Sequence, residues 1–236
     1  MASAASRHAT VGAVTLALAV LFWLSRPGWH WMHAWNRAFA DASLLLLVVT
    51  LVIGPLARLW TPAARWLSWR RELGVWSVIA ALGHMLIVME GWVEWDPSRL
   101  FYSINAFKRD WALDQGFALG NLLGIIALGY GLIQMATSND ASVRLLGGSS
   151  WKYVQQGAYV LYVLVALHTA YFLFWQFVSF HRPVPAPNWL QGPFLVTVSL
   201  LFVLQTAAFV ATVRRRANRR RSAPSENPDL ADLARS

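Results

Sequence analysis

Two histidines lie deep inside long apolar runs, where polar side chains are uncommon. His168 is in the run from Trp151 to Tyr171, and His84 is in the run from Glu72 to Trp92. A buried polar group without a partner destabilises a protein by about 1 to 3 kcal/mol, so a histidine retained inside a membrane segment indicates a function. Two imidazoles on two different helices can bind one iron between them. They are therefore candidate ligands of a single haem.

The depth of the two histidines agrees with a shared site. At about 1.5 Å per residue, His84 and His168 lie roughly 20 and 25 Å along their helices from Arg71 and Trp151. Both helices rise from the same side, so the two rings come to a similar depth. An iron held by two histidines has no open position for a substrate, which is typical of electron transfer. Gly83 is expected to help a porphyrin edge approach. The pattern alone leaves an alternative, in which each histidine only hydrogen-bonds a neighbouring helix.

The other histidines lie at expected membrane boundaries. His30 and His33 occur among tryptophans between Trp29 and Arg37, a composition typical of the aromatic belt at a membrane surface. Their i, i+3 spacing allows metal binding, but no third ligand is nearby. His181 follows the run from Trp151 to Tyr171 and is expected at the outer boundary of the membrane. We expect all of these imidazoles to be solvated.

Composition determines which elements must position the histidine pair. Of the 236 residues, 57% are hydrophobic and only 13% are charged, and the apolar residues form long blocks. This predicts a membrane protein that crosses the bilayer several times as helices, because the backbone must satisfy its own hydrogen bonds there. The chain has no cysteine, which excludes disulfides, thiolate-held iron–sulfur clusters and covalently attached haem.

The expected fold class is all-α, a bundle of about six transmembrane helices. A cytoplasmic leader over residues 1–10 precedes the haem-binding bundle over 11–213, and a disordered basic cytoplasmic tail occupies 214–236. The first apolar run also resembles a secretory signal peptide, but no clear cleavage site follows it. In the second helix, Gly54-Pro55 is expected to give a kink that neighbouring helices compensate. The expected helices are Val11–Leu24, Ala42–Trp60, Glu72–Trp92, Ala112–Ala136, Trp151–Tyr171 and Leu190–Val213.

Two further features, one within a helix and one between helices, are expected to carry a role. Gly116, Gly120 and Gly124 recur every fourth residue, so a neighbouring backbone or a flat ring can approach this face, most simply by ordinary helix packing. The connection from Gly91 to Trp111 is predicted to be a partly structured loop, with a lateral helix as one option. Its mixed charges predict a docking surface for a partner, and a plain solvated connector is the alternative.

The basic residues predict the topology. The N-terminus, the connections after the second and fourth helices and the tail together hold most of the 20 lysines and arginines. The positive-inside rule therefore places both termini in the cytoplasm and the Gly91 to Trp111 loop outside. A nucleic-acid-binding role does not follow from the net charge of +9, because the basic residues flank apolar blocks.

Several motifs resemble those of the ferric-reductase-like transmembrane family, over roughly Asp41 to Phe174. They are RRELGVWS…GH before and through the third expected helix, KRD…G from Lys108, ATSND…R.LG from Ala136, and W…Q…Y…LH from Trp151 to His168. Within that family, the chain is similar to the haem-binding membrane subunit of periplasmic methionine sulfoxide reductase systems.

The resemblance implies particular ligands and electron routes. His84 and His168 match family haem ligands, while Gln155 replaces the first fifth-helix histidine, which removes an inner redox station. The implied cofactor is haem b, with quinone or FMN as a candidate carrier of the incoming electrons. Electrons would come from quinol or a cytoplasmic flavin reductase and pass to a periplasmic, molybdenum-containing reductase across a bacterial inner membrane. The alternatives are a transmembrane ferric reductase, or a non-redox membrane subunit that has lost its cofactor, which the Gln155 replacement keeps open.

Overall fold

Six helices of the structure are long and apolar enough to cross a membrane. The computed structural model describes residues 3–104, 110–175 and 188–222. Within these residues the candidate spans are Ala4–Leu24, Trp31–Leu59, Thr61–Gly91, Gln115–Thr137, Gly148–Trp175 and Gln191–Asn218. The predicted all-α bundle of about six membrane-spanning helices is confirmed.

The second helix starts earlier than its apolar block predicts. Helix α1 (Ala4–Leu24) is followed by α2 (Trp31–Leu59), so most of the tryptophan- and histidine-rich stretch is helical. This stretch contains no glycine or proline after Gly28, so nothing in it breaks a helix. As a result Arg37 and Asp41 lie inside α2, on the same helix as the apolar block.

A proline inside α2 is compensated by a neighbouring helix, as predicted. Pro55 has no N–H, so the carbonyl oxygen of Leu51 lacks its usual donor in the helix. The side chain of Gln205, from helix α8 (Gln191–Ser222), donates a hydrogen bond of 3.2 Å to that oxygen. The compensation joins α2 to α8 in the middle of the bundle.

The third span begins in a 3₁₀ segment, η1 (Thr61–Trp69), and continues as α3 (Arg70–Gly91). The buried carboxylate of Glu72 lies in the first turn of α3, where the helix dipole favours a negative charge. Arg7 of α1 donates to Glu72 at 2.8 Å from its Nε atom. This ion pair joins α1 to α3 at one end of the bundle.

The connection after α3 contains a β-hairpin, which sequence analysis missed. A 3₁₀ turn, η2 (Pro97–Leu100), leads to strands β1 (Tyr102–Ile104) and β2 (Trp111–Leu113), which pair antiparallel. No lateral helix occurs in the described part of this connection. Lys108 and Arg109, which belong to the predicted docking loop, lie outside the described residues. Helix α4 (Gln115–Thr137) begins only after Asp114, whose side chain accepts from the N–H of Phe117 and caps the helix.

The second half of the chain holds the fifth and sixth spans. A short helix, α5 (Asp140–Leu146), leads into α6 (Gly148–Ala170), which continues as a π-helical turn, η3 (Tyr171–Trp175). Helix α8 runs on to Ser222, so residues 214–222 are helical where a disordered tail was expected. The rest of the expected tail, and His181, lie outside the described residues.

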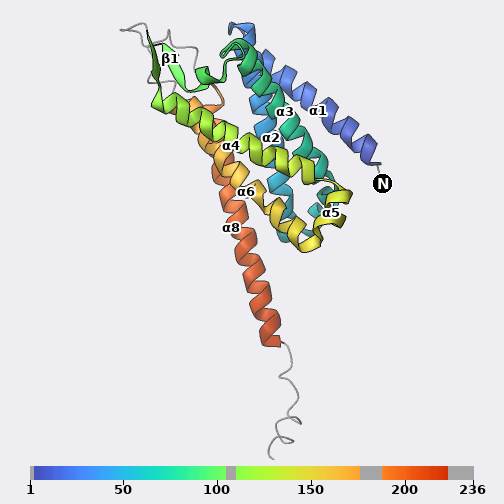
Figure 1. Cartoon of the computed structure of the whole chain (residues 1–236). Helices are drawn as coiled ribbons and strands as arrows, with labels where there is room; N and C mark the ends of the chain where they lie inside the picture. Colours follow the sequence, from blue (N-terminus) through green and yellow to red (C-terminus); the bar gives the residue numbers. More distant parts are fainter. Residues whose placement is uncertain (1–2, 105–109, 176–187, 223–236) are drawn as a thin grey trace, which may run out of the picture.

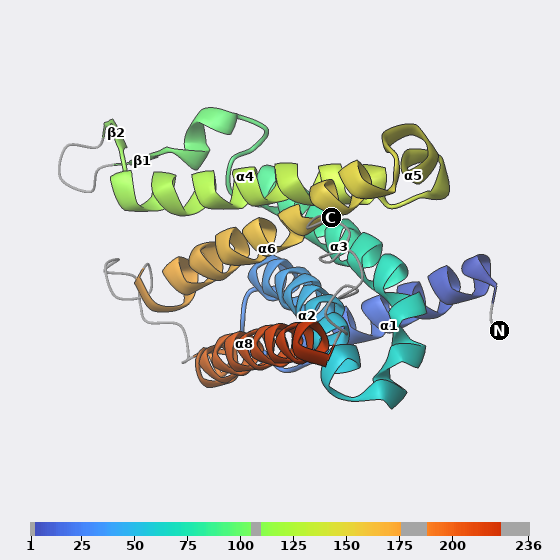
Figure 2. The ribbon, with the colours of Figure 1, turned by 90° about the horizontal axis from the view of Figure 1, so that it is seen from below.

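Helix α2 is the centre of the bundle. Half of its most apolar window is buried, against 11% to 22% for the other spans. It packs against α1, α3 and α8, while α4 packs against α6 and α3 (Figures 1 and 2). The hairpin, the start of α2 and the end of α3 lie at one end, here called the hairpin end; α5 and the start of α3 lie at the other, here called the α5 end (Figure 1).

Candidate functional site

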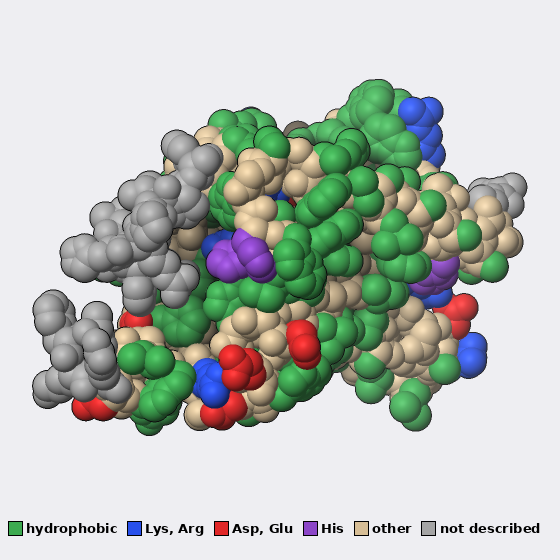
Figure 3. All heavy atoms as spheres, turned by 90° about the horizontal axis from the view of Figure 1, so that it is seen from above, with side chains coloured by type: hydrophobic (Ala, Val, Ile, Leu, Met, Phe, Trp, Pro, Cys, Tyr) green, Lys and Arg blue, Asp and Glu red, His purple; other side chains and the backbone are tan. Residues whose placement is uncertain are grey.

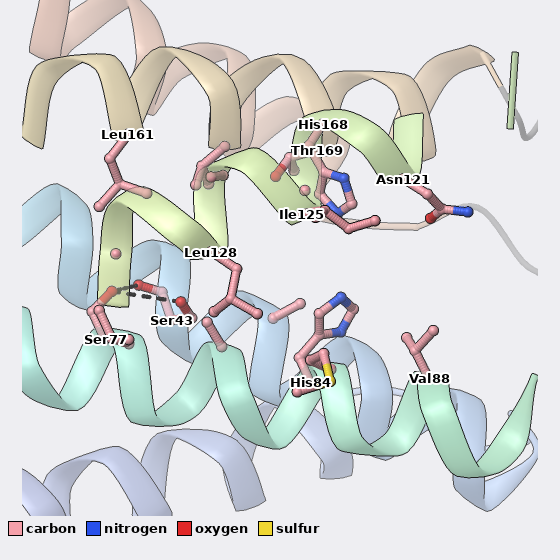
Figure 4. Close-up of a pocket in the computed structure, with 18 of the residues that line it drawn as sticks. Ser43, Ser77, His84, Val88, Asn121, Ile125, Leu128, Leu161, His168 and Thr169 are labelled. Atoms are coloured by element: carbon pink, nitrogen blue, oxygen red, sulfur yellow. Dashed lines mark hydrogen bonds between the residues drawn. The ribbon is translucent and has the colours of Figure 1, made fainter. Parts of the chain in front are cut away.

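A cavity of about 160 Å³ lies between α2, α3, α4 and α6. Its walls are mostly apolar, with side chains such as Leu128, Ile125 and Leu161 (Figure 4). Two serines add polar groups: Ser77 donates to the backbone oxygen of Ser43 at 2.9 Å. Asn121, also in the wall, donates to the carbonyl oxygen of Leu100 at 2.7 Å and so joins η2 to α4.

The two predicted histidines meet in this cavity. His84 points into it from α3 and His168 points into it from α6 (Figure 4). Their ring centres are 6.3 Å apart and the ring planes are inclined by 78°. Two residues that are far apart in the sequence are thus brought close together across one apolar space.

Each ring is held by a backbone carbonyl group from a neighbouring helix, which is a different one for each histidine. His84 Nδ1 lies 3.1 Å from the carbonyl oxygen of Asn36 in α2, and His168 Nδ1 lies 2.8 Å from that of Gly120 in α4. A carbonyl oxygen only accepts, so a neutral ring hydrogen-bonded in this way carries its proton on Nδ1 and keeps a lone pair on Nε2. Both imidazoles are therefore oriented to offer Nε2 to a metal.

The glycines of α4 make room for aromatic rings of the fifth span. A Cβ on Gly124 would lie 2.7 Å from Cε1 and Nδ1 of His168, and one on Gly120 would clash with the ring of Tyr171. A Cβ on Gly116 would also meet Tyr171, at 2.9 Å from its hydroxyl. These contacts are packing of one helix on the next, which was the simpler expectation for this face, and the rings that approach it are those of the protein itself.

Gly83, which was expected to help a porphyrin edge approach, packs against a neighbouring helix in this structure. It faces the ring of Phe39 in α2, where a Cβ would lie 3.0 Å from Cδ1. It is not among the residues that line the cavity. The structure therefore assigns Gly83 to the packing of α3 on α2, which places His84 beside the carbonyl group of Asn36.

His30, His33 and Gln155 lie away from the cavity. His30 and His33 have ring centres 5.7 Å apart at the start of α2, and His33 packs on Trp92 at 4.6 Å. Gln155 donates to the hydroxyl of Thr137 at 3.0 Å, so it joins α6 to the end of α4.

The donor set of the cavity limits which metal centre it can hold. Within the described residues, no group of three or more His, Cys, Asp or Glu side chains could hold a metal ion. A bare metal ion would therefore find two imidazoles and too few further ligands. A metal that brings its own equatorial ligands needs only the two axial nitrogens that the histidines offer.

Comparison with known proteins gives the family. The family model described as ferric reductase like transmembrane component matches residues 37–166. The chain is 27% identical to magnetosome protein MamZ of Paramagnetospirillum magneticum over 141 residues, 56% of this chain and 19% of that protein. It is 33% identical to the protein-methionine-sulfoxide reductase heme-binding subunit MsrQ of Ralstonia nicotianae over 154 residues, 65% of each chain.

The chain spans about a fifth of the length of the MamZ protein and just under two thirds of the MsrQ protein. No solved structure matches it. The family model covers more than half of the residues, including His84, and its match ends two residues before His168. The chain belongs to the ferric-reductase-like transmembrane family.

Proposed function

We propose that this protein is a haem b electron-transfer subunit of the membrane, in which His84 and His168 are the two axial ligands of one haem. The observation that carries the proposal is the pair of imidazoles that face each other across the cavity. The family match, and the name of the MsrQ relative as a heme-binding subunit, support haem as the cofactor.

The spacing of the two rings fits an iron between them. An iron bound to Nε2 of both rings, at about 2 Å from each nitrogen, sets the ring centres roughly 6 to 6.5 Å apart. The observed separation is 6.3 Å. The haem supplies reversible one-electron chemistry when it is bound, and with both axial positions filled it leaves no site for a substrate.

The chain's own residues would tune this chemistry. The carbonyl groups of Asn36 and Gly120 fix the orientation of the rings and raise the basicity of each Nε2 atom. The apolar walls of the cavity exclude water, so the iron would sit in a low-dielectric site. The protein therefore needs no acid or base at the cavity to perform electron transfer.

We further propose that electrons leave at the hairpin end, and that this end faces the periplasm. Arginines gather at the α5 end, around Arg58, Arg65, Arg70 and Arg71, which the positive-inside rule assigns to the cytoplasm. His84 is 7 residues from the end of α3 at Gly91 and twice as far from its start, so the cavity lies nearer the hairpin end. Electron tunnelling favours the shorter gap, and a partner is expected to approach on this side.

Charged side chains at the hairpin end offer a docking surface. Arg99 bonds Glu94 at 2.7 Å and lies 3.7 Å from Asp96. Acidic side chains and an arginine gather on one side of this face (Figure 3). Such a patch would steer a charged periplasmic reductase, of the type named in the MsrQ relative, and make its docking sensitive to salt. The donor would be quinol or a cytoplasmic flavin reductase at the other end.

The test of this function is the haem content and spectrum of the purified protein. We expect about one b-type haem per chain by pyridine haemochrome assay, with a low-spin spectrum that changes on reduction with dithionite. His84→Ala and His168→Ala are each expected to lose this spectrum, because one axial ligand cannot keep the iron low-spin. His30→Ala and His33→Ala are the matched controls and should leave it intact.

Three results would contradict the proposal. Protein without haem would favour a non-redox membrane subunit, and two haems per chain would require ligands beyond the cavity pair. An unchanged low-spin spectrum in either cavity variant would refute the ligand assignment.

A further inference from the structure

A cluster of charged side chains lies near the histidine cavity, formed by the first turns of α2 and the connection that precedes it. Asp41 forms an ion pair with Arg26, whose Nη2 atom donates to the carboxylate, and both side chains are almost completely buried. Arg37 lies one turn before Asp41 on the same helix and interacts electrostatically with it. The cluster therefore holds two guanidinium groups and one carboxylate.

The carboxylate is already engaged by Arg26. The side chain of Asn188 also approaches Arg26, with its oxygen 3.4 Å from Nη2. The rings of Trp29 and Trp189 lie on it, each centred 5.6 Å from its Cζ. Arg26 is thus held by protein groups just before α8 and at the end of α1, and among the described residues its Nε atom has no hydrogen-bond partner.

Arg37 is held much less well. Among the described residues it makes no ion pair within 4.0 Å and no hydrogen bond; the ring of Phe172 lies 5.7 Å from its Cζ atom. A charged side chain inside a membrane segment is uncommon unless it is paired with an opposite charge or lines a functional site. The cluster consequently has one positive charge more than it can balance.

The position of Arg37 connects this charge to the cavity. Asn36, the residue before it, gives its carbonyl oxygen to His84, and Ala40, one turn further on, lines the cavity. Phe172, which Arg37 covers, lies 4.9 Å from the ring of His168. Arg37 does not line the cavity itself, but it interacts electrostatically with both histidines, so its charge lies close to them.

We propose that Arg37 is the counter-ion of a carboxylate group on the ligand that fills this cavity, and that on the proposed function this carboxylate is a propionate of the haem. The planar guanidinium group can donate two parallel hydrogen bonds to a carboxylate. Such a pair would balance the charge cluster and would fix which edge of the porphyrin points to the hairpin end. Arg37 is therefore a positioning residue, distinct from the axial ligands.

The test compares two forms of the cofactor that differ only in charge. Apoprotein in a detergent free of anionic lipid is titrated with haemin and with haemin dimethyl ester, in which both carboxylates are neutral. We expect the wild-type protein to bind haemin about tenfold or more tightly than the ester, because a charge-assisted hydrogen bond is lost. In Arg37→Gln this ratio is expected to fall to about one, through weaker binding of haemin.

The spectrum separates this role from that of the ligands. Haem bound to Arg37→Gln should stay low-spin, because His84 and His168 are unchanged, and its midpoint potential should fall with the loss of a nearby positive charge. Arg37→Lys keeps the charge but loses the planar pair, so its ratio should lie between those of the wild type and Arg37→Gln. Arg99→Gln removes the same charge from the loop at the hairpin end and should keep the wild-type ratio.

The outcomes distinguish the two proposals. A wild-type protein that binds neither form refutes the haem function and this inference with it. A wild-type protein that binds both forms equally, or an Arg37→Gln variant that keeps the wild-type ratio, overturns only the inference. A ratio that appears only after addition of vesicles with anionic headgroups would assign Arg37 to a lipid phosphate and would also overturn it.

Discussion

Replacing Gly124 with alanine tests the geometry of the cavity directly. The new Cβ would lie 2.7 Å from Cε1 and Nδ1 of His168, where ordinary contacts begin at 3.4 Å. The ring must therefore move away from α4 by about 0.7 Å. The carbonyl oxygen that holds it, from Gly120, lies on α4 itself at 2.8 Å, so this hydrogen bond would lengthen to roughly 3.5 Å and be lost.

The expected effect on haem binding follows from that hydrogen bond. Loss of a hydrogen bond to a buried group weakens the site by about 1 to 3 kcal/mol, which is roughly a 5- to 150-fold loss of haem affinity. The assay is the transfer of haem from the purified protein to an apo-haem-binding acceptor, followed in the Soret band. Gly129→Ala is the matched control on the same helix, because nothing lies within 4 Å of its Cβ position.

Two results would refute this reasoning. Gly124→Ala could keep a haem affinity within about twofold of the control, which would mean that His168 is not held as described. Alternatively, both variants could lose haem equally, which would locate the effect in α4 as a whole. Far-ultraviolet circular dichroism and gel filtration of each variant check that the helices are intact.

Three further predictions concern stability and direction. Gln205→Leu should destabilise the bundle by about 1 kcal/mol in thermal unfolding, because the carbonyl group of Leu51 loses its donor. The destabilisation should be smaller in a Pro55→Ala background, where the helix itself supplies that donor. Equal effects in both backgrounds would disprove the compensation. The guanidinium group of Arg71 lowers the pKa of Asp140. Their exposed pair should therefore stabilise the fold above about pH 4 and lose this effect as the pH falls through the lowered pKa. If Asp140→Asn destabilised the protein more at pH 3 than at pH 7, the expected pH dependence would be wrong. In proteoliposomes of known orientation, reduced haem should pass electrons to a protein acceptor added at the hairpin end, and reoxidation only from the α5 end would overturn the direction.

Sequence patterns predicted the helices better than their ends. An apolar block of sufficient length is a strong signal, which is why all six spans were found. The start of α2 was missed because its first residues mix tryptophan with polar side chains, which lowers hydropathy without breaking a helix. The hairpin was missed because strands of three residues each are too short to show an alternating pattern.

The candidate site was predicted in part for a related reason. His84 and His168 stand out because imidazoles are rare in apolar runs, and the structure brings both to one cavity. The carbonyl groups of Asn36 and Gly120 that orient them carry no sequence signal, because every residue has a carbonyl group. The role of Gly83 was also beyond the sequence, since only the packing of α3 on α2 shows that it faces Phe39.

The carbonyl partners of the two rings have a consequence for how the protein is made. Each histidine lies on one helix and is oriented by another, so α2, α3, α4 and α6 must all be in place before the pair can offer its nitrogens. Helix α6 is the last of these four to leave the ribosome, because it follows the other three in the chain. Capture of the cofactor would thus be a late event in biogenesis, and it would report that the four spans around the cavity have assembled correctly.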